Sequence, residues 1–236
     1  MQAGSPRSIR VFHRDDLPRV LEEAGLSSGP VLVLVGGAGG LEVDEEERLS
    51  DLIRDYLVPA IARNRAMVVD GGTDSGIMRA IGKARSDTGA QFPLIGVASA
   101  GTVRSPDMEP GPESDAAVDP NHTHIVLVPG HEWGDESPWL SAVASALSVG
   151  HRSATMLVNG GEIAYADVHH SLNEGRPVIV LAGSGRTADA IAWADRDRSA
   201  DGRAARIAAS PLVRVVSVEN PETLAELLLE ATSAAG

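Results

Sequence analysis

The stretch Val31-Leu-Val-Leu-Val-Gly-Gly-Ala-Gly-Gly40 decides the fold class of this 236-residue chain. Its first five residues are apolar and rich in Val, a pattern that favours a strand buried on both faces. The glycines that follow are typical of a tight turn from such a strand into a helix. We therefore interpret this stretch as one strand of a parallel sheet that is covered by helices on two sides.

Similar strand-and-helix units follow along the chain. Further strands are expected at Met67–Val69, Leu94–Ala98, Thr123–Val128, Thr155–Val158, Val178–Leu181 and Val213–Val218, with Ile9–Phe12 as an additional edge strand. Helices are expected at Asp44–Arg63, Gly76–Arg85, Pro138–Val149, Ile163–Glu174, Thr187–Trp193 and Pro221–Ala231. This order predicts an α/β, Rossmann-like fold with a mostly parallel central sheet of about seven strands and helices on both faces.

Two polar stretches interrupt this alternation. Ala100–Asn121 contains four prolines and is long for a connection, so it is either a solvated insertion or a flap beside a site. Asp195–Arg206 is expected to form a surface turn. The chain shows no linker and no internal repeat, so residues 1–236 are expected to form a single domain.

Composition and charge narrow the class of function. The net charge is −13 at pH 7, which disfavours binding to nucleic acid or to an anionic membrane surface. The absence of Cys excludes disulfides and thiolate catalysis. Because Met1–Arg10 has no apolar segment and no apolar run approaches the length of a membrane span, we expect a cytoplasmic protein.

Four glycine clusters directly follow expected strands. They are Gly36-Gly37-Ala38-Gly39-Gly40, Gly71-Gly72-Thr73-Asp74-Ser75-Gly76, Asn159-Gly160-Gly161-Glu162 and Gly183-Ser184-Gly185-Arg186. The carboxyl ends of parallel strands share one edge, where backbone N–H groups and helix N-termini favour anions. The four clusters together predict a phosphate-binding crevice. None of them matches a Walker loop or Gly-x-Gly-x-x-Gly, so an ordinary dinucleotide dehydrogenase is not expected.

Side chains within these clusters suit a diphosphate. Thr73, Ser75, Ser184 and Thr187 offer hydroxyl groups, and Arg186 offers a guanidinium. Arg186 stands at a helix start, a place that disfavours cations, and this favours a functional over a merely solvated side chain. Cleavage of an N-glycosidic bond would need a carboxylate, for which Glu162, Asp167 and Asp74 are the candidates. Asp74 and Glu162 are also interpretable as helix caps.

Histidine and tryptophan side chains add further candidates. His122 and His124 are two residues apart in an expected strand, so one of them is expected to line the crevice. No metal site is expected. Trp133 and Trp139 are both candidates to cover an adenine ring, although core packing suits at least one of them.

In this order, the motifs resemble the SLOG superfamily of Rossmann-like domains, which includes the LOG-type phosphoribohydrolases. The chain is similar in particular to the branch that forms the cytosolic N-terminal domain of TRPM channels. The resemblance rests on Val31–Gly40, Val68–Ala84, Asp119–Val128 with its Asn-His-Thr-His, and Gly183–Ile191. It implies a site for ADP-ribose, cyclic ADP-ribose or NAD-like molecules, with no required cofactor.

One departure bears on catalysis. The family's LOG enzymes carry Pro-Gly-Gly-x-Gly-Thr-x-x-Glu, whereas this chain has Asn159-Gly-Gly-Glu-Ile-Ala-Tyr-Ala-Asp167, with Asp167 in place of the Glu. We therefore expect a ligand-binding sensor, with a LOG-type nucleotide N-glycosidase or phosphoribohydrolase using Asp167 or Glu162 as the alternative. The expected ligand-binding residues are Gly36, Gly37, Ala38, Gly39, Gly71, Gly72, Thr73, Asp74, Gly76, His122, Gly160, Gly161, Glu162, Gly183, Ser184, Gly185, Arg186 and Thr187.

The expected partners are a small-molecule nucleotide and a second copy of the chain, in a homodimer or larger homo-oligomer. The apolar positions Leu224, Leu227 and Leu228 are compatible with such an interface. The same leucines also suit a helix that covers the sheet.

Overall fold

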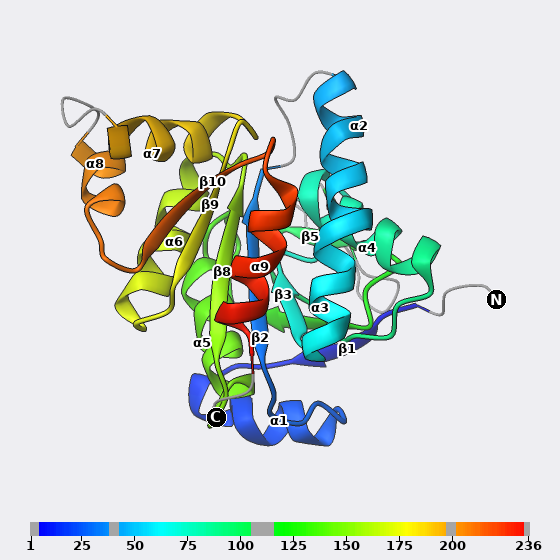
Figure 1. Ribbon diagram of the computed structural model, residues 1–236. Helices are drawn as coiled ribbons and strands as arrows, with labels where there is room; N and C mark the ends of the chain where they lie inside the picture. The colour runs from blue at the N-terminus through cyan, green and yellow to red at the C-terminus, as the bar shows by residue number, and fades with distance from the viewer. Residues whose placement is uncertain (1–4, 38–42, 105–115, 197–201, 234–236) are drawn as a thin grey trace.

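A computed structural model describes residues 5–37, 43–104, 116–196 and 202–233. Its main sheet has eight parallel strands in the order β1-β7-β4-β3-β2-β8-β9-β10 (Figure 1). Their bounds are β1 Arg7–Arg10, β2 Val31–Gly36, β3 Met67–Asp70, β4 Leu94–Ser99, β7 His124–Val128, β8 Ser153–Val158, β9 Val178–Ala182 and β10 Val213–Ser217. The α/β fold class is confirmed. The eighth strand is β1, which pairs with β7 at the edge; it is the additional edge strand expected at Ile9–Phe12, but it runs over Arg7–Arg10.

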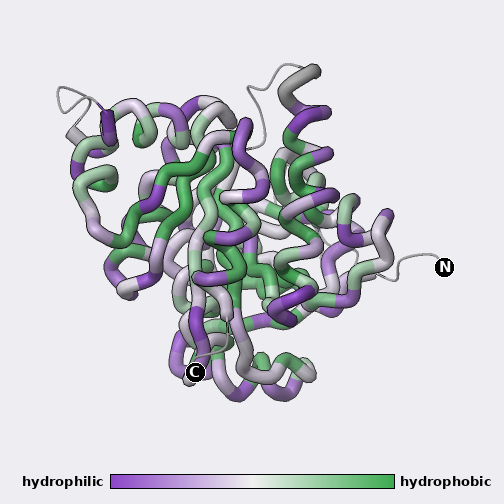
Figure 2. Tube along the Cα trace, in the orientation of Figure 1, coloured by the Kyte–Doolittle hydropathy of each residue, from purple (hydrophilic) through white to green (hydrophobic). Residues whose placement is uncertain are grey.

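Helices cover both faces of this sheet. One face carries α1 (Leu17–Glu23), α5 (Ser137–Leu147), α6 (Glu162–Asn173), α7 (Arg186–Arg196) and α8 (Gly202–Ala208). The other carries α2 (Val43–Leu52), the π-helical turn η2 (Ile53–Leu57), α3 (Val58–Asn64), α4 (Gly76–Thr88) and α9 (Pro221–Ala231). In Figure 2 the strands are mostly hydrophobic, while the surrounding helices also carry hydrophilic residues.

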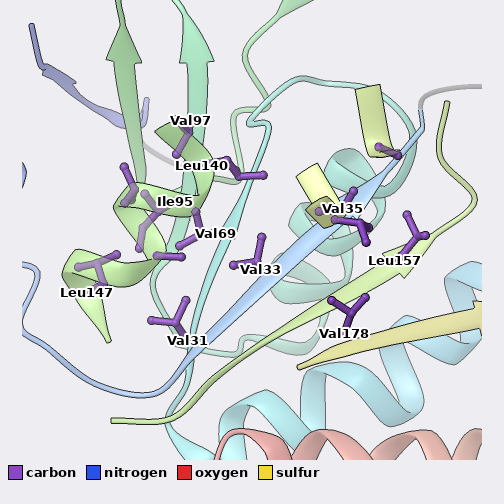
Figure 3. Packing of buried hydrophobic residues seen from close by; sticks show 14 of the residues in the cluster. Val31, Val33, Val35, Val69, Ile95, Val97, Leu140, Leu147, Leu157 and Val178 are labelled. Atoms are coloured by element: carbon purple, nitrogen blue, oxygen red, sulfur yellow. The ribbon is translucent and has the colours of Figure 1, made fainter. Parts of the chain in front are cut away.

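The alternation of side chains along β2 explains the two layers. Val31, Val33 and Val35 join the core beneath α1 and α5–α8, and Figure 3 shows them in succession along β2. Leu32 and Leu34 join the opposite core beneath α2–α4 and α9. All five side chains are buried, as expected for a parallel strand between two helical layers.

The structure corrects several sequence predictions. The expected helix Asp44–Arg63 is α2, η2 and α3 in succession, because a π-helical turn interrupts it. Asp195–Arg206 is not simply a surface turn, since α7 runs to Arg196 and α8 begins at Gly202. Helix α1 was not predicted. Leu224 and Leu228 of α9 are buried against the sheet, so they belong to the core.

Part of the expected insertion Ala100–Asn121 is described. It forms β5 (Val103–Arg104) and β6 (Ala116–Ala117), which pair in parallel as a separate two-stranded sheet. Val118 then bridges to Thr73 in the turn that follows β3. The described ends of the insertion therefore lie beside the glycine turn 71–76, and the flap interpretation falls on residues outside the described ones.

Candidate functional site

The two central strands β2 and β8 are parallel, but the order in which strands are added to the sheet changes direction between them. From β2 the strands proceed outward through β3, β4 and β7, and the chain then returns to place β8 on the other side of β2. Such a switch point leaves a crevice beyond the carboxyl ends of the two central strands, because the following loops turn to opposite sides. The Gly36–Gly37 and Asn159–Gly161 loops leave the sheet here.

A cavity of about 590 Å³ lies at this edge. The volume falls within the range of small-molecule sites in proteins. Loops that follow β2, β3 and β8 contribute Gly36, Gly37, Gly71, Thr73, Ser75 and Gly161. Side chains from other parts of the lining include Met78, Trp133, Glu136, Leu140, Glu162, Ile163, Asp167 and Arg186.

The structure brings ten of the sequence-predicted residues to this cavity. They are Gly36, Gly37, Gly71, Thr73, Ser75, Trp133, Gly161, Glu162, Asp167 and Arg186. Ala38 and Gly39 lie outside the described residues. Gly183 and Ser184 line a second cavity of about 400 Å³, together with Tyr56 of η2 and Pro221 of α9. Within the described chain, Gly72, Asp74, Gly76, His122, Gly160, Gly185 and Thr187 are not part of either lining.

Arg186 spans two glycine loops. A Cβ atom built on Gly37 would lie 3.2 Å from Arg186 Nη1, and one on Gly161 would lie 3.0 Å from Nη2. Glycine at both positions therefore lets the guanidinium approach the loops after β2 and β8. The Arg186 backbone is left-handed, with φ of 45°, which is unfavourable for a side-chain-bearing residue and is found at functional sites.

Side chains of residues 183–187 form hydrogen bonds with the neighbouring loop 159–161. The backbone N–H of Asn159 donates to Ser184 Oγ at 2.8 Å, and Ser184 Oγ donates to the carbonyl of Leu181 at 2.6 Å. Thr187 Oγ1 donates to the carbonyl of Gly161 at 3.0 Å. Both hydroxyl groups thus form hydrogen bonds with backbone atoms, so Ser184 and Thr187 position the loop 159–161.

The two proposed catalytic carboxylates differ in their surroundings. Glu162 is 78% exposed in its side chain and pairs with Arg203 of α8 at 2.8 Å. Asp167 lines the cavity further along α6. Burial raises its pKa to about 7; the Ser137 hydroxyl opposes this shift and the charge of Glu136 adds to it. Asp167 is therefore the interior carboxyl of the pair.

The helix-cap interpretation of Asp74 and Glu162 is wrong. The N-cap of α4 is Ser75, and that of α6 is Gly161. Asp74 instead pairs with Arg79 at 2.9 Å. Glu162 is the first residue of α6, where a negative charge is favourable with the helix dipole.

His122 does not reach the cavity. It precedes β7, and its imidazole lies between Asp70 and Asp119, 2.8 Å from each. Its side chain is fully buried. His124 begins β7 and contacts Thr123 Oγ1 at 2.9 Å. Among the described residues, no three His, Asp or Glu side chains are arranged so that they could hold a metal ion.

Trp133 and Trp139 differ in their surroundings. Trp133 is 48% exposed and lines the cavity. Trp139 packs against the core, with the Arg14 guanidinium 5.3 Å from its ring centroid. The indole that is available to a base is therefore that of Trp133.

Sequence reasoning missed Glu136. It is the N-cap of α5 and lines the cavity from the loop that follows β7. This loop carries no glycine cluster, which was the signal that identified the others. Its position after an expected strand was the one available clue.

Within the described residues, no helix is both long and apolar enough to cross a bilayer. A family model described as "SLOG in TRPM, prokaryote" matches residues 29–226. The chain is 28% identical over 203 residues to a transient receptor potential cation channel subfamily M member-like 2 of Nematostella vectensis, covering 70% of this chain and 13% of that protein. It is 25% identical over 203 residues to subfamily M member 2 of Mus musculus, covering 71% and 13%.

The chain thus spans about an eighth of the length of these curated relatives. The family model covers most of the chain, including every glycine cluster at the sheet edge. The resemblance predicted from those clusters is confirmed. The chain belongs to the SLOG family, in its prokaryotic TRPM-type group.

Proposed function

We propose that this SLOG domain is a sensor that binds a nucleotide-derived ligand with a diphosphate, of the class of ADP-ribose, cyclic ADP-ribose or NAD. The position of Arg186 carries the proposal. Its guanidinium lies against glycine loops from both central strands, at the edge where α/β sheets bind ligands. A planar guanidinium donates two parallel hydrogen bonds to a phosphate group.

Backbone groups supplement this charge. Helix α6 begins at the cavity with Gly161 as its N-cap, and a glycine has no side chain with which to cap the first N–H groups. These groups and the helix dipole favour a phosphate. The exposed indole of Trp133 offers a surface on which an adenine ring stacks.

Calorimetric titration with ADP-ribose, cyclic ADP-ribose, NAD and AMP tests the proposal. Arg186→Ala is expected to weaken binding at least tenfold, because a hydrogen bond to a charged group contributes about 1.5–3 kcal/mol. Arg196→Ala is the matched control, since Arg196 is exposed at the other end of α7. Failure of all four nucleotides to bind would refute the proposal.

Asp167 favours a second function, hydrolysis of an N-glycosidic bond. A partly buried carboxyl whose pKa is raised to about 7 is suited to acid–base work at neutral pH, and such hydrolysis requires a carboxylate. Chromatography of the incubated nucleotides would then show free base accumulating with time. Asp167→Asn should abolish its release. Intact nucleotide at saturating protein would leave the sensor as the function.

A further inference from the structure

The cavity wall formed by the β7–α5 loop and α6 is acidic, in contrast to the Arg186 side. Glu136 and Asp167 both line it, and the charge of Glu136 acts on Asp167. The Glu136 carboxylate repels a phosphate, and both side chains accept hydrogen bonds from hydroxyl groups. The acidic and the basic side chains of the lining therefore suit different parts of one nucleotide.

The Glu136 carboxylate is held in a defined position. Ser99 Oγ donates to Oε2 at 3.1 Å, and the backbone N–H of Gly134 donates to both oxygens at 3.0 and 3.1 Å. Ser99 ends β4, so the carboxylate is fixed to the sheet edge itself. A carboxylate offers about four lone-pair positions, so these bonds leave capacity for a ligand.

Neighbouring residues indicate which part of a nucleotide would lie there. Trp133 precedes Glu136 by three residues in the same loop, and both line the cavity. In a nucleotide the ribose lies between the base and the phosphates. With the base on Trp133 and the diphosphate at Arg186, the adenosine ribose lies beside Glu136.

We propose that Glu136, together with Asp167, binds the 2′ and 3′ hydroxyls of the adenosine ribose and excludes ligands phosphorylated at the 2′ oxygen. This inference rests on the function proposed above, since it specifies how the same cavity selects among adenine nucleotides. A 2′-phosphate would meet the Glu136 carboxylate directly. A 2′-deoxy ligand would leave that carboxylate without its hydroxyl donor.

Titration with ADP-ribose, ADP-ribose 2′-phosphate and 2′-deoxy-ADP-ribose tests this selection. The wild-type protein is expected to bind each analogue roughly tenfold more weakly than ADP-ribose, through repulsion in one case and a lost charged hydrogen bond in the other. Glu136→Gln keeps the side-chain shape and removes the charge. It should lessen the discrimination against the 2′-phosphate.

Glu132→Gln is the control, because Glu132 is exposed in the same loop and is not part of the described lining. It should keep the wild-type preference. Equal binding of ADP-ribose and its 2′-phosphate by the wild-type protein would overturn the inference and leave the proposed function standing. Undiminished discrimination in Glu136→Gln would also overturn it. Binding of none of the three ligands would refute the proposed function and this inference with it.

Discussion

His122 Nε2 lies 2.8 Å from Asp70 Oδ1, although 52 residues separate the two in the chain. Asp70 ends β3, and the same oxygen accepts the backbone N–H of Gly72 at 2.7 Å. On its other side, His122 Nδ1 lies 2.8 Å from Asp119 Oδ2. The cluster thus joins the turn that carries Gly71 and Thr73 to the segment before β7, and so holds one wall of the cavity.

Removal of the imidazole should destabilise the fold strongly. His122→Ala would leave Asp70 and Asp119 buried without their shared partner, and Asp70 Oδ2 already has no hydrogen-bond partner among the described residues. Loss of one member of a buried ion pair costs about 3–5 kcal/mol. Urea denaturation at pH 6 measures the change in unfolding free energy. His151→Ala, at an exposed turn, should change it by less than about 0.5 kcal/mol.

The same cluster predicts how stability depends on pH. Burial alone would lower the pKa of His122, but the charge of Asp70 and the hydrogen bonds to Asp119 and Asp70 outweigh it and raise the pKa to about 9. The stabilisation that protonated His122 provides is therefore complete below pH 6.5, the pKa of His122 in the unfolded chain. It is lost as the pH rises toward 9, the pKa in the fold. Denaturation across this range should show a fall of roughly 3 kcal/mol. A flat profile from pH 6.5 to 9 would show that His122 is neutral in the fold.

Gly82 allows α4 to pack against this cluster. A Cβ atom on Gly82 would lie 2.1 Å from Asp119 Oδ2. Gly82→Ala should therefore cost about 1–3 kcal/mol, although glycine to alanine in a helix ordinarily stabilises by about 1 kcal/mol. Gly202→Ala in α8 is the comparison, since among the described residues its Cβ would meet only Arg206 Nη1 at 3.6 Å. Thermal unfolding of both variants should give shifts of opposite sign.

The sequence predicts the sheet edge well because the signal is local. A strand followed by glycines places Gly36, Gly71 and Gly161 at one edge wherever the strands are parallel, whatever the strand order. Arg186 follows from the same reasoning. The approach of its guanidinium to Gly37 and Gly161 depends on β8 lying next to β2, which only the structure gives.

The remaining features depend on contacts that are distant in sequence. His122 was expected at the crevice, but its two carboxylate partners come from distant places, Asp70 at the end of β3 and Asp119 within the expected insertion 100–121. Glu136 owes its position to Ser99 and to its own turn, neither of which the residue pattern reveals. Histidine and glutamate are common on surfaces, so their type alone does not distinguish these roles.

The contribution of Asp167 to stability should depend on pH in the opposite direction from that of an ordinary aspartate with a lowered pKa. Its pKa in the fold is about 7, above the usual 3.8, because burial disfavours the charged form. The folded state thus binds the extra proton between these values, and stability falls as the pH rises from 3.8 to 7. Asp167→Asn should gain at least about 1 kcal/mol relative to wild type at pH 8 compared with pH 4. A constant difference between the two proteins over this range would contradict the shift.

Because the backbone of Arg186 is strained, substitutions there should affect the stability of the protein and its affinity for ligand differently. Its φ of 45° suits glycine and disfavours residues with a Cβ atom. Arg186→Gly and Arg186→Ala both remove the guanidinium, so both should lose affinity for ADP-ribose to the same extent. The glycine variant should be the more stable by about 1 kcal/mol, because only it relieves the left-handed backbone. Thermal unfolding with parallel titration checks this, and equal stability of the two variants would show that the turn is unstrained. Retained strain beside a ligand site is expected where the side chain serves binding, since selection for stability alone would place glycine there.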